Sequence, residues 1–298
     1  VYRDGEYLAK VSGGTLNYSS AGLLANTSYS YCIAAVSSDG IEGSSSTIVK
    51  KYTLAQVPEA GAFSEISSGT VRANWSGNGT AYYAENVTLS RNSGWIGGTS
   101  WQDSGLTPNT SYYYQVKARN GDSVETSTVT LGWAWTYAAV PSTPTAVAGY
   151  NVTDKYYVDI TIPEEGNPAY TEYAIFGGND NQGYGWLTGS GSTDTAKAWR
   201  TKAVWETGST NRHTGLSNST TYYYRLTARN GEGEETELSG TRTVVTATLD
   251  VPENVAVAEK NDDVLRITWN AVNEAMSYKV YRATATDGEW TNIASGIT

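Results

Sequence analysis

Histidine and cysteine, two side chains that often carry catalysis or bind metals, each occur once in this 298-residue chain, as His213 and Cys32. A zinc site built from several of them, and a disulfide within the chain, are therefore excluded. A serine–histidine–aspartate site could use only His213, and no G-x-S-x-G nucleophile motif accompanies it. We expect a surface His213, a buried apolar Cys32, no catalytic residue, no bound metal and no cofactor.

Clustered carboxylates are the next candidates for chemistry, because a pair of them can cleave a glycoside. That reaction needs a cleft that tunes their pKa values. The densest acidic run follows an Asn-Gly pair in an expected loop, so we expect a solvated hairpin there, and the same holds for Glu164-Glu165. The run consists of Glu232, Glu234, Glu235 and Glu237.

The stretch 178–183, G-N-D-N-Q-G, superficially resembles a calcium loop. A calcium ion needs six or more oxygen ligands, and Asp180 is the single certain anion here. We therefore expect a turn at 178–183. The acidic stretch 261–263 is likewise expected to be a hairpin turn before Val264.

Aromatic residues between positions 176 and 213 are the strongest candidates for binding. Aromatic rings among polar neighbours can stack on sugars, so these rings are candidate glycan contacts. The alternative is that they form a small core of their own, because each such ring buries roughly 150–250 Å². Trp95 and Trp101 occupy a comparable place earlier in the chain, which favours the core. The candidates are Tyr184, Trp186, Trp199 and Trp205.

The sequence also contains eight N-x-S/T sequons, at which a source that glycosylates asparagine could attach sugar. Their number only mildly exceeds chance. The candidate N-glycosylation sites are Asn17, Asn26, Asn74, Asn78, Asn86, Asn109, Asn151 and Asn218.

The charge balance restricts the partners of the chain. Its formal net charge is −10 and its pI about 4.7, which argues against nucleic acid and anionic membranes. No stretch approaches the ~18 apolar residues that a membrane helix needs, so we expect no membrane insertion. The 31 glycines and the 12% aromatic content suit strands and turns.

An internal repeat in the sequence indicates which structural elements hold the candidate residues in place. The pattern L-x-P-x-T-x-Y-x-Y-x-V-x-A begins at Leu23, Leu106 and Leu216, with the proline replaced in two copies. Large residues recur at every second position, which predicts a strand with one buried face. Val-Pro pairs at 57, 140 and 251 follow expected closing strands and mark boundaries, since proline suits a domain start.

A tryptophan stands eighteen residues after two of the Val-Pro pairs, and the middle copy has Ile160 or Ile162 instead. Together these features resemble tandem fibronectin type III repeats, of the kind found in large bacterial cell-surface or secreted proteins. The resemblance implies an all-β fold: immunoglobulin-like β-sandwiches in a linear array. It also implies a core that includes two tryptophans and three corner tyrosines. These are Trp75, Trp269, Tyr29, Tyr112 and Tyr222.

The boundaries predict four parts. Residues 56–138 and 139–249 form complete domains, the second with about 27 extra residues, mostly at 176–213. Residues 1–55 and 250–298 form the C-terminal and N-terminal halves of further sandwiches. Either the chain is a window on a longer repeat protein, or the halves of neighbouring subunits complete one another and propagate a filament.

These features favour a non-catalytic extracellular protein of structural or adhesive function, as a segment or subunit of a surface fibre or stalk. The alternative is a spacer or carbohydrate-binding module of a secreted polysaccharide-active protein. The expected partners are other copies of the chain or neighbouring repeats, and surface glycans.

Overall fold

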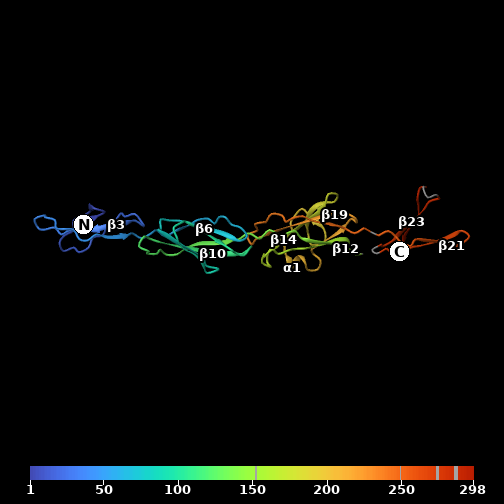
Figure 1. Cartoon of the computed structure of the whole chain (residues 1–298), viewed down its shortest axis with the longest axis horizontal. Helices are drawn as coiled ribbons and strands as arrows, with labels where there is room; N and C mark the ends of the chain where they lie inside the picture. Colours follow the sequence, from blue (N-terminus) through green and yellow to red (C-terminus); the bar gives the residue numbers. More distant parts are fainter. Residues whose placement is uncertain (152, 249, 273–274, 285–287) are drawn as a thin grey trace. The chain divides into compact units, whose positions relative to one another are not determined.

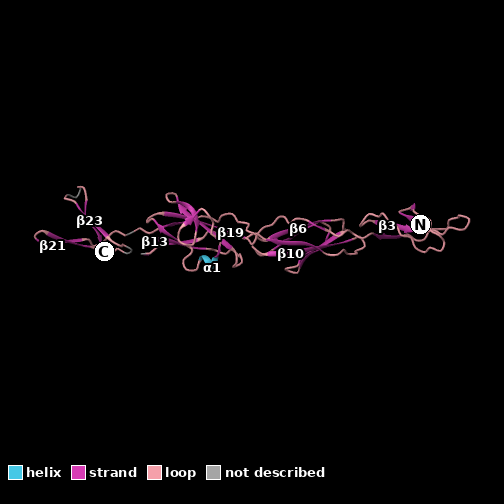
Figure 2. Cartoon of the chain, turned by 180° about the vertical axis from the view of Figure 1, so that it is seen from behind, coloured by secondary structure: helices cyan, strands magenta, loops and turns pink. Residues whose placement is uncertain are grey.

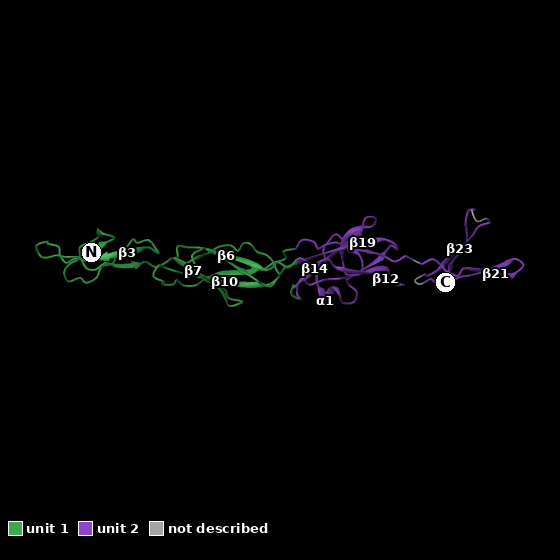
Figure 3. Ribbon diagram, in the orientation of Figure 1, with its two compact units in different colours: residues 1–139, 166–168, 229–235 green, residues 140–165, 169–228, 236–298 purple. Residues whose placement is uncertain are grey.

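A computed structural model describes residues 1–298 except 152, 249, 273–274 and 285–287. Nearly all of its regular structure is antiparallel strand, and the described residues contain one helix, α1 (Lys202–Trp205) (Figure 2). The chain divides into two compact units (Figure 3). The first comprises residues 1–139, 166–168 and 229–235, and the second 140–165, 169–228 and 236–298.

The first unit contains a complete two-layer sandwich, here called the first sandwich (Figure 1). One layer has the order β5-β6-β9 and the other β11-β10-β7-β8. This is the arrangement that the fibronectin type III resemblance implies. The strands are β5 (Glu59–Ala60), β6 (Thr70–Ser76), β7 (Ala81–Asn86), β8 (Arg91–Ile96), β9 (Ser100–Ser104), β10 (Ser111–Arg119) and β11 (Val129–Trp135).

Alternation along β6 and β10 builds the core of the first sandwich. On β10 every second residue is buried, from Tyr112 to Ala118, as the sequence pattern predicts. On β6, Val71, Ala73 and Trp75 face the same core. Trp75 is 4% exposed and lies in this core.

The second unit contains the second sandwich, with layers β12-β13-β18 and β16-β15-β14-β19-β20; β17 also pairs with β14. Val158 pairs with His213 as Val71 pairs with Asp103 in the first sandwich. Ile162 lies four residues after Val158, as Trp75 lies four after Val71, so Ile162 corresponds to Trp75. The strands are β12 (Thr145–Asn151), β13 (Lys155–Thr161), β14 (Glu172–Asn179), β15 (Gly183–Leu187), β16 (Thr193–Asp194), β17 (Arg200–Thr201), β18 (Arg212–Leu216), β19 (Thr221–Arg229) and β20 (Arg242–Val245).

The three corner tyrosines make the contact that the repeat pattern predicts. Each phenol oxygen accepts a hydrogen bond from a backbone N–H five residues earlier, which satisfies a group that a tight corner would otherwise leave unpaired. The distances are 3.0 Å for Tyr29, 2.9 Å for Tyr112 and 2.9 Å for Tyr222.

Residues 1–55 form one four-stranded sheet of order β2-β1-β3-β4. With a single layer, its side chains are covered only in part. Tyr29 is therefore half-buried rather than a core residue. Cys32, expected to be buried, is partly exposed because it takes the outward position that Gln115 takes on β10. The strands are β1 (Tyr2–Arg3), β2 (Glu6–Tyr7), β3 (Ser28–Cys32) and β4 (Val49–Tyr52).

Residues 250–298 form two separate hairpins within the second unit. Trp269 is half-buried and contacts Tyr278, with ring centroids 5.2 Å apart, so it is not a core residue here. The proposed four-part division of the chain stays a prediction. The strands are β21 (Ala256–Asn261), β22 (Val264–Thr268), β23 (Tyr278–Arg282) and β24 (Thr291–Ile297).

Replacing Trp75 with alanine should lower the free energy of unfolding of the first sandwich by ~3–5 kcal/mol, because the side chain is buried between the layers. A denaturant titration measures the loss. The matched control is Trp133→Ala, since that ring is 61% exposed and its removal should cost less than ~1 kcal/mol. Equal losses for the two variants would contradict the assignment of Trp75 to the core.

Candidate functional site

The extra residues of the second sandwich lie mainly between β14 and β18. They add β15, β16, β17 and the four-residue helix α1 to one layer. Thr201 caps α1, its Oγ1 accepting from the Val204 N–H at 3.4 Å. The insertion therefore extends an existing sheet.

Trp205, a candidate glycan contact, belongs instead to the core. Its side chain is 0% exposed, and its Nε1 donates to the Tyr173 carbonyl at 2.8 Å. The guanidinium of Arg200 lies 4.9 Å from the ring centroid and also donates to the Thr188 carbonyl. A sugar cannot reach Trp205, so for this residue the core alternative is correct.

Trp186 and Trp199 are half-buried and share one cation. The Lys197 ammonium lies 4.7 Å from the Trp186 ring centroid and 5.6 Å from that of Trp199. Trp186 also packs on Phe176, with ring centroids 5.1 Å apart. Both tryptophans thus hold the insertion together.

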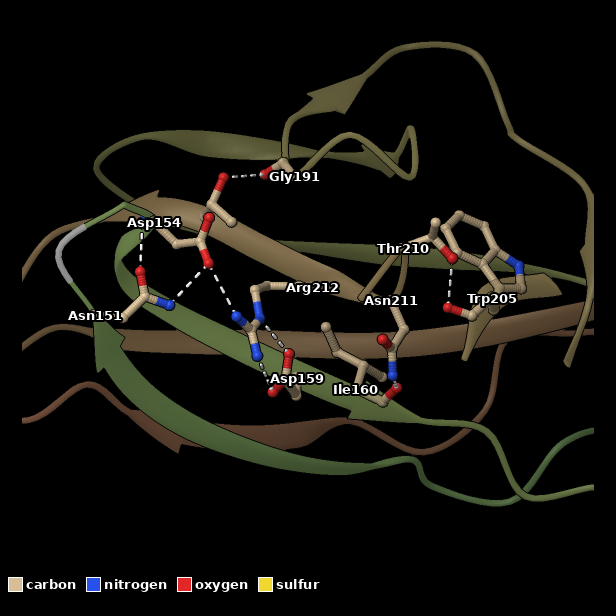
Figure 4. A network of polar contacts seen from close by, with 10 residues as sticks. Asn151, Asp154, Asp159, Ile160, Gly191, Trp205, Thr210, Asn211 and Arg212 are labelled. Carbon is tan, nitrogen blue, oxygen red and sulfur yellow. Dashed lines mark hydrogen bonds and ion pairs between the residues drawn. The ribbon is translucent and has the colours of Figure 1, made fainter. Parts of the chain in front are cut away.

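A network of charged groups joins the end of the insertion to β13 (Figure 4). The Arg212 guanidinium donates to both carboxylate oxygens of Asp159, at 2.7 and 2.8 Å, and to Asp154 at 2.9 Å. It also lies 3.7 Å from the Tyr157 ring centroid. Hydrogen bonds from Asn151 and Arg212 hold the pKa of Asp154 below its usual range. The network fastens β18 to the sheet.

His213 is buried, 8% exposed, which corrects the expectation of a surface histidine. Its Nδ1 lies 3.0 Å from the Tyr224 hydroxyl, and burial lowers the pKa of the imidazole from 6.5 to about 4. At neutral pH the ring is therefore uncharged and bonded inside the sandwich. Its burial and its lowered pKa both make the imidazole poorly suited to act as a catalytic base.

The first sandwich places a different polar residue at the same position. Asp103 precedes Leu106 by three residues, as His213 precedes Leu216. Its Oδ2 accepts from the Tyr114 hydroxyl at 3.2 Å and from Asn86 at 2.7 Å. Aligning the two repeats on their leucines would have shown that Asp103 and His213 occupy equivalent positions.

Tyr184 is the one candidate glycan contact that projects from the sheet, with 46% of its side chain exposed. It stacks on Phe176, with ring centroids 5.9 Å apart and an angle of 11° between the rings. Its hydroxyl donates to Asp180 Oδ1 at 2.7 Å, and this bond raises the pKa of Tyr184 to about 12. A cavity of about 280 Å³ lies beside these rings. Its lining consists of Phe176, Asp180, Tyr184, Tyr223, Arg225 and Thr241.

The acidic stretches lie in turns and loops. Glu232, Glu234 and Glu235 are exposed in the turn after β19, and Glu164-Glu165 are exposed too. The 178–183 segment forms a turn in which Asn179 Oδ1 accepts from two following amides. Within the described part of the chain, no three histidine, cysteine or acidic side chains are grouped so as to hold a metal ion. No helix there is long and apolar enough to cross a membrane.

Most of the eight sequon asparagines are engaged in the fold. Asn86 is 0% and Asn109 2% exposed, so neither can carry a glycan in the folded protein. The half-buried Asn74 and Asn78 make hydrogen bonds to neighbouring groups, as do Asn26 and Asn151. The exposed ones are Asn17 and Asn218.

Corner asparagines make a second, repeated contact within the first unit. Asn26 Oδ1 accepts from the Gly121 amide at 3.1 Å, and Asn120 Nδ2 donates to the Thr53 carbonyl at 3.0 Å. The ring of Tyr52 covers Gly121 so closely that a methyl group at that glycine would collide with it. Residues 1–55 and the first sandwich are thereby joined by side chains as well as by the linker.

The same set of contacts recurs later in that unit. Asn109 Oδ1 accepts from the Gly231 amide at 2.8 Å, and Asn230 Nδ2 donates to the Thr136 carbonyl at 3.2 Å. Trp135 covers Gly231 as Tyr52 covers Gly121. Asn26 and Asn109 both have a positive φ, 46° and 44°, which asparagine tolerates better than most residues.

Acidification should weaken the second sandwich. The unfolded chain protonates His213 below its ordinary pKa of 6.5, whereas the folded chain does so only near 4. The unfolded state thus binds more protons in this window, and stability should fall by about 2 kcal/mol between pH 7 and pH 5. Denaturant titrations at the two pH values measure the difference, and His213→Asn should reduce it.

The imidazole can also be observed directly, because the chain has one histidine. An NMR titration of its ring protons should give a pKa near 4 in the folded protein. A value near 6.5 in folded protein would show that the ring is accessible to water.

Glycosylation in a competent host should follow exposure. Folded, secreted protein should carry sugar at Asn17 and Asn218 and none at Asn86 or Asn109, because a glycan on a buried side chain is incompatible with the core. Mass spectrometry of proteolytic peptides locates the sugars. A glycan on Asn86 of correctly folded material would contradict the packing described for β7.

The solved structures that are similar to this chain include two with tandem fibronectin type III domains. A two-domain fibronectin type III segment from chicken tenascin has 16% sequence identity and a TM-score of 0.38, and the match covers 64% of this chain and 100% of that one. The FN1–FN3 domains of chicken CNTN1 have 15% identity and a TM-score of 0.28, over 80% and 84% of the two chains. No family model matches the sequence, and no curated protein does. The sequence motifs and paired sheets of this chain indicate tandem repeats of the fibronectin type III kind.

Proposed function

We propose that this chain is part of a non-catalytic extracellular protein with a structural or adhesive role, a segment or subunit of a surface fibre or stalk. The observation that carries the proposal is the repeated contact between a corner asparagine and a hairpin glycine in the first unit. A protein whose repeats serve mechanically needs junctions that transmit force, and this contact fits that need.

Residues 1–55 and the first sandwich are joined by a short linker together with interactions that a free hinge would lack. Beside the asparagine contact, the Asp122 carboxylate accepts from the Tyr52 amide at 2.8 Å and pairs with Lys51 at 3.2 Å. The backbone bond from Tyr52 and the lysine hold the pKa of Asp122 below its usual range. Since Lys51 and Tyr52 lie on β4, force along β4 reaches the first sandwich through several bonds.

The proposal that the chain is not an enzyme is supported by where its reactive groups lie. His213 is buried against Tyr224, and the glutamates of the acidic stretches lie in loops and turns. A catalytic base must reach its substrate within hydrogen-bond distance, which His213 cannot do without opening the sandwich.

The proposed partners are further copies of the chain or neighbouring repeats of the same chain. The sheet of residues 1–55 leaves apolar side chains uncovered, such as Leu16, 95% exposed, and Ile33, 60% exposed. Both border a cavity of about 530 Å³. A sandwich of this type is completed by a layer containing its first two strands, and β21 and β22 are such strands in an exposed hairpin.

Self-association of the purified chain should rise with concentration in sedimentation experiments if copies complete one another. Ile33→Asp should abolish it, because a carboxylate would then face the added layer. The matched control is Val147→Asp, a residue 68% exposed on β12, which should leave association unchanged. A monomer at every concentration would contradict pairing between copies and leave neighbouring repeats as the partner.

A second candidate function is a spacer or carbohydrate-binding module of a secreted polysaccharide-active protein. The exposed ring of Tyr184 beside a cavity favours it, and surface glycans would then be partners. The two functions are compatible, since an adhesive repeat can also bind sugar.

Antibodies against the second sandwich test the proposed location and role on cells of the source. Labelling of intact cells, with the antigen in material sheared from their surface, is the expected result. Labelling only after lysis would contradict an extracellular structural role.

Hydrogen exchange tests the two asparagine–glycine contacts directly. The amides of Gly121 and Gly231 should exchange slowly, because each donates to an asparagine side chain. Asn26→Gly, which keeps the positive φ and removes the acceptor, should speed exchange at Gly121 by about tenfold and leave Gly231 unchanged. Asn109→Gly should do the reverse. Each variant is the matched control of the other, and equal rates in all three proteins would contradict the proposed junction.

A further inference from the structure

The outer face of the second sandwich carries a cluster of aromatic side chains that the core does not use. Along β19 the inward residues are Tyr222 and Tyr224, while Tyr223 and Arg225 point outward. Phe176 on β14 and Tyr184 on β15 share this outer face. We call the cavity of about 280 Å³ beside them the Tyr184 pocket.

The aromatic part of the Tyr184 pocket is prearranged. Tyr184 lies nearly parallel to Phe176, and its ring centroid is 6.4 Å from that of Tyr223. The hydrogen bond from the Tyr184 hydroxyl to Asp180 fixes the ring at its outer end. Side chains held in this way lose little conformational entropy when a ligand stacks on them.

The polar part of the pocket stands beside the rings. Arg225 Nε donates to Thr241 Oγ1 at 2.8 Å, and both residues line the pocket. A guanidinium has five N–H donors, and the Asp180 carboxylate, also in the lining, supplies acceptors. The pocket thus combines apolar ring surface with donors and acceptors around it, the usual composition of a small-molecule site.

From this arrangement we propose that the Tyr184 pocket binds one neutral pyranose ring of a glycan. A pyranose presents a face of C–H groups, complementary to the electron-rich face of an aromatic ring, and hydroxyls around its rim. The cavity volume lies below the roughly 300–1,000 Å³ typical of drug-sized ligands, which suits one ring. Asp180 and the net charge of −10 disfavour acidic sugars and nucleic acid.

The first sandwich supplies an internal comparison. Gln115 occupies the position of Arg225, one residue after the second buried tyrosine of its strand. It donates to the Glu85 carboxylate at 2.7 Å, so the two side chains satisfy each other across that face. At this position the first sandwich therefore has an amide that is bonded to a neighbouring carboxylate, where the second sandwich has a guanidinium beside the Tyr184 pocket.

Saturation-transfer NMR on the full chain tests the proposal with the methyl glycosides of glucose, galactose, mannose and N-acetylglucosamine, each at about 10 mM, where millimolar binding is detected. We expect transfer to the ring protons of at least one glycoside. Tyr184→Ala should weaken its binding at least tenfold, whereas Tyr184→Phe, which keeps the ring, should weaken it less.

The matched control is Trp133→Ala, which removes an exposed ring from the first sandwich and should leave binding unchanged. Far-ultraviolet circular dichroism confirms that each variant is folded. No transfer from any of the four glycosides, or equal loss in Tyr184→Ala and Trp133→Ala, would overturn the proposal. The structural role proposed above does not depend on this pocket, so either proposal can fail alone.

Discussion

A tyrosine hydroxyl can enter a sandwich core only if it finds a hydrogen-bond partner there, because burying it unpaired costs free energy. The central strands β10 and β19 each bury two tyrosines. The first of each pair accepts from a corner amide and so fixes how the chain enters the strand. The hydroxyl of the second tyrosine needs a hydrogen-bond partner from the opposite layer. For this reason β9 and β18 each place a polar residue in the core.

The two sandwiches supply this polar partner with different residues. Tyr114 is hydrogen-bonded to Asp103, which also accepts from Asn86, whereas Tyr224 is hydrogen-bonded to His213. In both cases burial is the first cause that raises the pKa of the tyrosine, so the phenol stays protonated and able to donate. The histidine version ties the stability of its sandwich to pH in the mildly acidic range.

Features that depend on alternation and on repetition could be predicted from the sequence. The buried face of β10, the corner hydrogen bonds and the burial of Trp75 follow directly from the repeated tyrosine pattern and its spacing. They are local, or fixed by one strand and its neighbours. For the same reason, the residue of the second sandwich that corresponds to Trp75 could be predicted to be Ile160 or Ile162.

Features that depend on tertiary surroundings could not be predicted in this way. A single histidine before a corner gives no periodic signal, so its burial at 213 was missed. Tyr29 stands at the position of the buried Tyr112 and Tyr222, yet residues 1–55 supply one layer, and a strand pattern does not say whether a second layer covers it. Among the insertion aromatics, only packing separates Trp205 in the core from Tyr184 at the surface.

The inner and outer faces of the strands differ in how freely their residues can change. The inner faces of the strands are filled by the tyrosines and their polar partners. The corners are held by hydrogen bonds to the backbone and by the corner asparagines. The outward residues of β14, β15 and β19 take part in neither set of contacts. The insertion widens that sheet by β15 and β16 and places Tyr184 on its outer face, so a new surface is added without disturbing the core or the junctions. Repeats of this kind can therefore keep a common core while single members differ in the side chains on their outer faces.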